Sequence, residues 1–333
     1  MKTFKVRICF ETHAATPLHS DTLFGHLCWM YRYMHGEESL HRELLRDYDQ
    51  APSLILSDGF PAGFLPRPCL PPASDQEISP LFGEFFSVRD RIHFLEFLAA
   101  FKKAAKIPWV HAQAMEELRT NLSPRGLVRV LLASEIKTTG KTRPGMIDAD
   151  HMLIPHNTIN RLTDTVEKDG GGFFHSQEVA ARNKLYDIYV KTKLDWEAET
   201  IREIFSLLGK WGYGKDRSTG KGQFIVKSIS EEHLPGEGNA VMALSHFVPD
   251  GSLSKGYYEL YTKYGKLGGH YSQGNVAFPK TPLLLLKPGA IFKVSEKREF
   301  YGQSLGPVHP ELEDVRQQTY LFPYFLKMGD SEK

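Results

Sequence analysis

Cysteine is scarce in this chain of 333 residues, which contains only Cys9, Cys28 and Cys69. Their number is odd, and no two of them form a Cys-x-x-Cys pair. A disulfide framework or a structural zinc site needs paired or clustered cysteines. We therefore expect buried free thiols in a reducing compartment, and neither disulfides nor a zinc framework.

Long hydrophobic runs are missing as well. No apolar stretch approaches the roughly 20 residues that a helix needs to span a bilayer. The first residues alternate Lys2, Lys5 and Arg7 with apolar side chains, whereas a signal peptide has a continuous apolar core. The sequence thus predicts a cytoplasmic protein with no membrane partner.

The chain also has almost no net charge, because 41 basic residues face 40 acidic ones. A protein that coats nucleic acid with its whole surface carries a large basic excess. Basic residues are instead concentrated locally. Residues 125–143 hold five cations, including Lys141, against one acid, and residues 252–298 hold eight against two. We expect any binding of an anionic ligand to be local, although such runs are often only solvated faces.

Familiar catalytic motifs are absent. The sequence has no His-Glu-x-x-His, no Gly-x-Ser-x-Gly and no cluster of aspartates of the kind that holds two metal ions. Histidines such as His13, His19 and His26 are possible general acids or bases, but most histidines are surface or core residues. We therefore expect no metal, no cofactor and no enzymatic activity.

The most distinctive segment that is present is the glycine loop, residues 209–222. Its five glycines alternate with four cations, two aromatic residues and a Ser-Thr pair. Glycine lets main-chain N–H groups approach an anion closely, while cations and hydroxyls add charge and donors, so the composition suits a phosphate backbone. The loop matches neither the Walker A nor the Gly-x-Gly-x-x-Gly pattern, which argues against a nucleotide-hydrolysing P-loop. A surface turn joining two elements is the alternative.

Periodicity along residues 1–233 predicts one α+β domain with insertions. Residues 4–10 alternate as a strand does, and Leu23, Phe24, Leu27, Tyr31 and Met34 follow helical spacing from a cap at Ser20 to Gly36. The later elements expected are strands at 54–56 and 185–190, a helix capped by Asp195, and a strand at 224–229. This order is the ferredoxin-like βαββαβ plan, with the glycine loop between the second helix and the last strand.

Two insertions interrupt this domain. Residues from about 73 to 125 have helical periodicity, after a proline-rich connector at 61–72. Residues 127–136 read as a strand, with a turn at 138–140. Residues from about 148 to 184 are polar and glycine-interrupted, which predicts a protruding loop or hairpin. After a linker at 234–238, residues 239–333 are β-rich and predict a second, smaller domain.

Four segments, in order along the chain, closely resemble the fourth Csm subunit of type III-A CRISPR effector complexes, a family of the RAMP superfamily. They are Leu18–His26, Leu56–Pro66, Pro155–Arg161 and the glycine loop with its Ser-Thr-Gly-Lys-Gly end. The resemblance runs from the first strand to the β-rich region. It implies two ferredoxin-like (RRM-like) modules, of which the second is degenerate.

The resemblance also implies a function. Such subunits cap the repeat-derived 5′ tag of the CRISPR RNA and are not known as the slicing subunit. They contact the large polymerase-like subunit on one side and a backbone RAMP subunit on the other, so we expect a hetero-oligomer with target RNA nearby through the guide. A RAMP-type endoribonuclease that processes CRISPR RNA is the alternative, and a free-standing RNA-binding protein is a third interpretation.

Carried over residue by residue, the resemblance nominates RNA-binding positions in the glycine loop, at the start of the first helix and in the protruding element. Asn157 and Asn160 have an alternative role, since asparagine in loops most often caps its own backbone. Whether Trp211 stacks on a base or packs underneath stays open. The full set of candidates, with Lys141 from the basic segment, is His19, Ser20, Asp21, Lys141, Asn157, Asn160, Arg161, Trp211, Gly212, Tyr213, Gly214, Lys215, Arg217, Ser218, Thr219, Gly220, Lys221 and Gly222.

Overall fold

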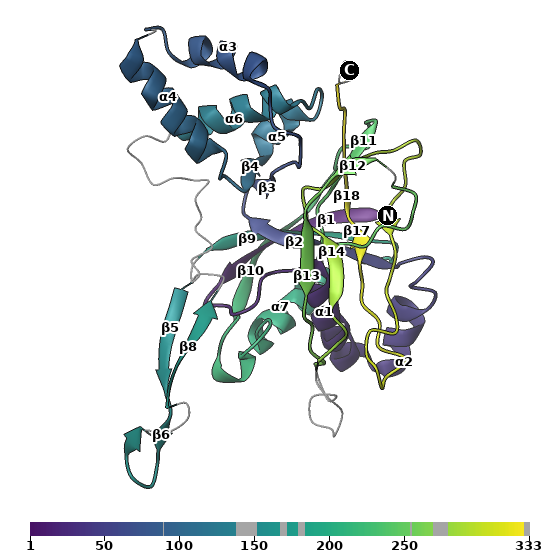
Figure 1. Ribbon diagram of the computed structural model, residues 1–333. Helices are drawn as coiled ribbons and strands as arrows, with labels where there is room; N and C mark the ends of the chain where they lie inside the picture. The colour runs from purple at the N-terminus through teal and green to yellow at the C-terminus, as the bar shows by residue number, and fades with distance from the viewer. Residues whose placement is uncertain are drawn as a thin grey trace.

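A computed structural model describes residues 1–88, 90–137, 152–166, 172–178, 184–253, 255–268 and 279–329. Figure 1 shows a central sheet with a group of helices above it and a hairpin extending below it, both at the left of the view, and with the C-terminal strands at the right. Lys141 and the turn expected at 138–140 lie outside the described residues. Within the described part of the chain, no helix is long and apolar enough to cross a membrane.

The central sheet contains four antiparallel strands in the order β10-β1-β9-β2. They are β1 (Lys2–Phe10), β2 (Leu54–Pro61), β9 (Leu185–Thr192) and β10 (Phe224–Glu231). The alternation seen in the sequence is confirmed in β1, where Phe4, Val6, Ile8 and Phe10 are all buried. Strand β2 is longer than expected, because a bulge between Leu56 and Gly59 lets it continue to Pro61.

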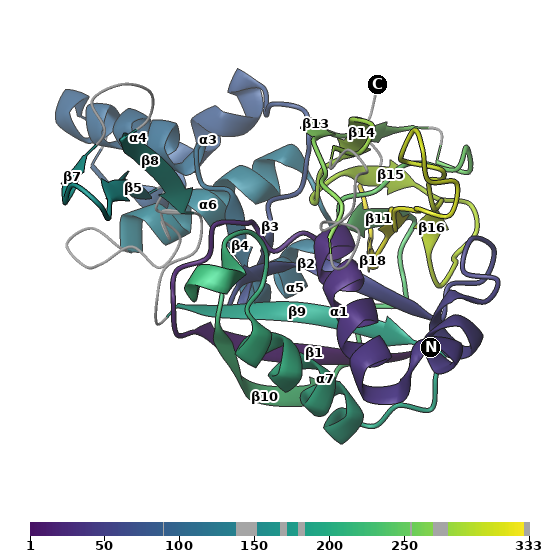
Figure 2. The same ribbon diagram turned by 90° about the horizontal axis from the view of Figure 1, so that it is seen from below.

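Two helices, α1 (Ser20–His35) and α7 (Ala198–Trp211), cover one face of this sheet (Figure 2). Both N-termini differ from the predictions. The N-cap of α1 is His19 rather than Ser20, and that of α7 is Glu197 rather than Asp195. Asp195 instead lies 3.5 Å from the Lys2 ammonium. After α1, Gly36 ends the helix at φ 85° as expected, and two short elements follow, α2 (Glu37–Ser39) and η1 (Leu40–Leu45).

The first insertion is helical, as predicted, but it extends further. Its helices are α3 (Asp75–Phe85), α4 (Arg91–Ala104), α5 (Ala112–Leu118) and α6 (Pro124–Lys137). The strand expected at 127–136 is wrong, because Leu127, Leu131 and Leu132 are buried at helical spacing along α6. The connector before the insertion includes β3 (Phe64–Pro66), which pairs with β4 (Trp109–His111).

The second insertion is a hairpin, which is one of the two forms that the sequence left open. Strand β5 (Met152–Asn157) pairs with β8 (Phe173–Glu178), and β6 (Ile159–Asn160) pairs with β7 (Thr165–Val166) towards the tip. Figure 1 shows the hairpin projecting away from the central sheet. Several of its apolar side chains are exposed, among them Leu153, Leu162 and Phe173.

The described residues after 233 contain strands and no helix, in agreement with the β-rich prediction. The main sheet has the order β12-β15-β11-β18, and shorter pairs flank it. The strands are β11 (Ala240–Ala243), β12 (Gly256–Tyr257), β13 (Leu260–Lys263), β14 (Leu283–Leu286), β15 (Ile291–Lys293), β16 (Tyr301–Gly302), β17 (Tyr320–Leu321) and β18 (Pro323–Leu326).

Strands β11 and β18 are buried on both faces. Met242 and Tyr324 point into the large core that includes the central sheet, while Val241 and Phe325 belong to a second hydrophobic cluster. Successive residues of a strand point to opposite faces, so one strand can separate two cores. The C-terminal region is thus packed firmly on the first part of the chain.

Candidate functional site

The first three residues of the glycine loop form the end of α7, and the conformation of the rest explains its glycines. Gly212, Gly214, Gly220 and Gly222 all have positive φ, as does Asp216, which precedes the short turn η2 (Arg217–Thr219). A Cβ on Gly214 would lie 2.5 Å from Thr16, and one on Gly222 would lie 2.1 Å from the carbonyl oxygen of Tyr213. Gly220 has open space around it. Close packing within the protein therefore requires at least two of these glycines.

Main-chain N–H groups of the loop are used inside the protein. Gly214 donates to His26 Nε2 at 3.1 Å, and Lys215 donates to Thr16 Oγ1 at 2.9 Å. Gly222 donates to the carbonyl oxygen of His13 at 2.8 Å. The expected cradle of free amides is thus not available at these three positions.

The two aromatic residues of the loop have different surroundings. Tyr213 is fully buried, and its hydroxyl donates to the carbonyl oxygen of Pro17 at 2.6 Å, so its ring is a core residue. Trp211 is 45% exposed and stacks on Tyr33 of α1, with ring centroids 4.9 Å apart. The Arg217 guanidinium lies 6.0 Å from the Trp211 centroid, within cation–π range. Trp211 therefore packs on the surface of the helices.

The cations of the loop also divide into two kinds. The Lys215 side chain is 68% exposed, and Ser218 and Thr219 are exposed beside it. Lys221 is 16% exposed and donates to Glu178 Oε1 at 2.9 Å and to Ser176 Oγ at 3.1 Å. Because Glu178 and Ser176 belong to β8, Lys221 ties the loop to the base of the hairpin.

Glu178 is 2% exposed, and a carboxylate is seldom buried so completely unless it is paired. Besides Lys221, the imidazole Nδ1 of His13 lies 3.2 Å from its second oxygen. The carboxylate therefore lies where three segments that are far apart in the sequence meet: the segment after β1, the hairpin and the glycine loop. The loop and the hairpin, which were nominated separately, meet at this residue.

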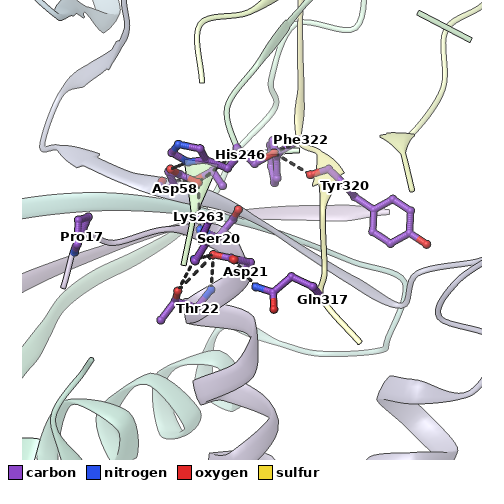
Figure 3. Close-up of polar contacts among 12 residues, drawn as sticks. Pro17, Ser20, Asp21, Thr22, Asp58, His246, Lys263, Gln317, Tyr320 and Phe322 are labelled. Atoms are coloured by element: carbon purple, nitrogen blue, oxygen red, sulfur yellow. Dashed lines mark hydrogen bonds and ion pairs between the residues drawn. The ribbon is translucent and has the colours of Figure 1, made fainter. Parts of the chain in front are cut away.

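Asp58 of β2 organises the start of α1 (Figure 3). Its Oδ1 accepts the backbone N–H of Ser20 at 3.0 Å and that of His246 at 3.2 Å, and its Oδ2 lies 2.6 Å from His246 Nδ1. Burial alone would raise the pKa of Asp58, but His246 and these N–H donors lower it below its usual value. The ionised carboxylate thus caps α1 from a distant strand and fixes His246.

The candidates at this helix start are largely buried. Ser20 and Asp21 are 1% and 5% exposed. The Asp21 carboxylate accepts from Lys263 and Gln317 of the C-terminal region (Figure 3). Burial opposes its ionisation, yet Lys263 holds the pKa of Asp21 below its usual range. These polar groups are engaged in joining the two parts of the chain.

His19 lies beside His246, with ring centroids 4.3 Å apart, and burial lowers the pKa of His19 to about 4. His19, Asp58 and His246 offer possible metal-ligand atoms within 4.8 Å of one another. Both oxygens of Asp58 already accept N–H groups, however. The arrangement therefore suits a buried hydrogen-bonded cluster better than an ion site.

The hairpin carries the remaining candidates. Asn157 is exposed at the end of β5, and Arg161 is exposed after β6. The Asn160 side-chain oxygen accepts the N–H of Leu162 at 2.9 Å, which is the turn-capping role considered as its alternative. The outward groups here are thus Asn157 and Arg161.

Comparison with models of known protein families identifies the family of this chain. A model of the RAMP superfamily matches residues 15–225, which include β2, β9, both covering helices, the hairpin and the glycine loop. The chain belongs to the RAMP superfamily. Among curated proteins none matches the sequence of this RAMP protein.

Solved structures share the fold of this RAMP protein over its whole length. A chain from the crystal structure of a Csm1–Csm4 cassette in complex with pppApA has 14% identity and a TM-score of 0.55, covering 99% of this chain and 100% of its own. The same cassette in complex with cA4 gives the same values. A chain of the Csm3–Csm4 subcomplex from a type III-A interference complex has 15% identity and a TM-score of 0.49, covering 98% and 99%.

Several residues of this RAMP protein's site were not nominated from the sequence. Asp58 is part of the Leu56–Pro66 motif, so the motif indicated this segment but not the role of Asp58. His246 and Glu178 had no local signal, because their partners are far away in the chain. Tyr33 follows Trp29 at helical spacing, and that spacing could have indicated an aromatic surface on α1.

Proposed function

We propose that this RAMP protein is a fourth Csm subunit, which binds and caps the 5′ tag of the CRISPR RNA in a type III-A effector complex. In this proposal it has no catalytic role. It links the large polymerase-like subunit to the backbone subunits of the complex in antiviral defence. The proposal depends on the glycine loop and the hairpin, which are in contact with each other.

The observation that carries the proposal is the meeting of these segments at Lys221 and Glu178. This contact places the loop, with its exposed Lys215, next to the base of the hairpin. Single-stranded RNA is held by cations on its phosphates and by polar side chains on base edges and 2′-hydroxyls. Lys215 with Ser218 and Thr219 supply the first kind of contact, and Asn157 with Arg161 supply the second.

The fold supports the same assignment. Taken in chain order, the strands of the central sheet are arranged fourth, first, third and second, with a helix after the first and third. This order agrees with the βαββαβ connectivity of a ferredoxin-like module, and we propose that residues 1–233 form such a module. We propose that the C-terminal strands are the degenerate second module. The whole-length likeness to a chain of the Csm1–Csm4 cassette also favours a subunit of this kind.

The partners follow from the same proposal. A subunit that caps the tag contacts the large polymerase-like subunit and a backbone RAMP subunit, and it lies near target RNA paired with the guide. Nearly balanced charge is consistent with a protein whose RNA contact is one local path and whose other faces meet protein.

The test is reconstitution with the neighbouring subunits and competition between tagged RNA and RNA with a scrambled tag. We expect the tagged RNA to bind more tightly. Replacing Asn157 and Arg161 by alanine should reduce this discrimination with little effect on salt dependence, because base contacts distinguish sequences and phosphate contacts do not. Equal loss for both RNAs would mean that the hairpin holds only the backbone.

A RAMP-type endoribonuclease is the second candidate, and one observation favours it. His246 is oriented by Asp58 and lies against a neutral His19, and such imidazoles are common general acids and bases. Incubation with repeat RNA separates the two functions. Specific cleavage that disappears in His246→Ala would support the nuclease.

A further inference from the structure

A cavity of about 1040 Å³ is lined in part by Pro17, Leu18 and His19, and the Pro17 carbonyl oxygen also accepts from Tyr213 of the glycine loop. Its walls come from β2, the proline-rich connector, the segment before β4, and the C-terminal strands. Cavities that bind small ligands usually have volumes of about 300–1,000 Å³. The volume is therefore sufficient for a ligand larger than an ion or a water cluster.

Aromatic rings from two parts of the chain line this cavity. Trp109 of β4 is half-buried, and Tyr257 and Tyr258 are 43% and 52% exposed. Trp109 packs edge-on against Phe60, and Tyr258 stacks on Phe292, so neighbouring rings hold both in place. Supported aromatic rings with accessible surface are suited to stacking against a planar ligand.

The cavity also offers positive charge. Arg67 is half-buried in its wall and donates to the carbonyl oxygen of Ala105. Among the described residues, Glu259 attracts the half-buried Arg67 guanidinium, but no carboxylate lies within ion-pair distance of it. Lys287 adds a second cation, which lies 2.9 Å from Glu259. An anionic group at Arg67 would supply the missing partner.

His246 and His19 form the polar end of the cavity. Since the ionised Asp58 can only accept, His246 Nδ1 must donate to it, which leaves Nε2 as an acceptor when the ring is neutral. The neutral His19 beside it has one donor and one acceptor. The cavity thus combines aromatic rings, a guanidinium that has no carboxylate within ion-pair distance among the described residues, and fixed hydrogen-bonding groups.

We propose that this cavity binds one nucleotide, with its base against Trp109 and Tyr257 and its phosphate at Arg67. A nucleotide has one feature for each part of the lining: a flat base for the aromatic rings, polar base edges for the histidines, and a phosphate for Arg67. It is either a free nucleotide or the end of an RNA chain. The site is separate from the glycine loop and goes beyond the tag-binding function proposed above.

The experiment uses the whole protein, freed of RNA, titrated with AMP and with adenosine. Calorimetry measures affinity, and quenching of Trp109 fluorescence reports stacking. We expect saturable binding of AMP, weaker binding of adenosine, and quenching that is lost in Trp109→Phe. Tyr257→Ala should weaken both ligands by about fivefold to a hundredfold, the range found when a stacking ring is removed. Arg67→Gln should weaken AMP and leave adenosine unchanged.

Tyr264→Ala is the matched control, because Tyr264 is 78% exposed in the same region and does not line the cavity. Thermal unfolding checks that each variant is folded, and the titration of the unsubstituted protein does not depend on any variant. A short RNA that displaces AMP would identify an RNA end as the source, and one that does not would identify a free nucleotide. The proposal is overturned if AMP shows no saturable binding at millimolar concentration. It is also overturned if Lys215→Ala and Arg217→Ala abolish binding, since that would place the nucleotide at the loop.

Discussion

The Lys221 ammonium of the glycine loop lies 2.9 Å from Oε1 of Glu178, at the base of the hairpin. Both side chains are mostly buried, so the pair cannot separate without leaving a charge in a poorly solvated place. The loop and the hairpin should therefore move as one unit. Lys221 therefore has a structural role, whereas the exposed Lys215 is accessible to a ligand.

Lys221→Met should loosen the hairpin. Removing one partner of a buried pair costs about 3–5 kcal/mol, and here the cost should appear locally. Hydrogen exchange of residues 152–157 and 173–178 measures it, with Lys215→Met as the control that leaves protection unchanged. Adding Glu178→Leu to Lys221→Met should restore part of the protection, as a double-mutant cycle would detect. Unchanged exchange in Lys221→Met would mean that other contacts hold the hairpin.

Lys215→Ala combined with Arg217→Ala should weaken RNA binding and reduce its salt dependence. Each phosphate contact on a single strand contributes about −0.7 to the log-log slope, so loss of two contacts makes the slope shallower by about 1.4. Binding to the reconstituted complex at several salt concentrations measures the slope. Lys227→Ala, an exposed cation of β10, is the control. A slope equal to that of the unsubstituted protein would leave the loop as a turn or a protein contact.

The isolated chain should cleave neither repeat RNA nor a guide–target duplex, with or without divalent metal. The reason is that Asp58, the carboxylate next to the two histidines, already accepts N–H groups from Ser20 and His246 and is not free to act as a base or a metal ligand, while His246 itself is buried. Gel analysis of end-labelled RNA is the measurement. Site-specific products that vanish in His19→Ala or His246→Ala would instead assign the protein to the nucleases.

Acid should destabilise the fold through His26. Burial, with a smaller effect of Arg217, lowers the pKa of His26 from 6.5 to about 4. The unfolded chain thus binds a proton that the folded chain excludes, and the free energy of unfolding decreases as pH falls from 6.5 towards 4. His26→Gln, which has a side-chain oxygen to accept the N–H of Gly214, should show a weaker decrease. Urea unfolding across this pH range tests the difference, and equal curves would mean that His26 titrates normally.

Local patterns predicted much of the fold, and long-range partners account for what was missed. β1 and α1 were recognisable because one face of each is buried, which gives periods that the sequence displays. Helix α6 was mistaken for a strand because Val128 and Val130 favour strands, although tertiary packing decides such cases. The cysteines are partly rather than fully buried, and none forms a disulfide.

In the candidate site, too, local features were predicted and long-range contacts were missed. The glycine loop and the hairpin were found from composition and motif, but their connection through Glu178 was not, because nothing local marks that residue. Asp58 and His246 are 188 residues apart, so no spacing rule indicates their hydrogen bond. Composition cannot separate a buried lysine such as Lys221 from an exposed one such as Lys215.

The position of β1 in the middle of its sheet has a consequence for how the chain is made. Its neighbours are β9 and β10, so its two edges are covered only by residues 185–192 and 224–231. During synthesis the first strand waits with both edges open until most of the polypeptide has left the ribosome. Open strand edges invite pairing with other chains. The nascent protein therefore needs protection over that interval, and slowing translation before residue 231 should increase its aggregation.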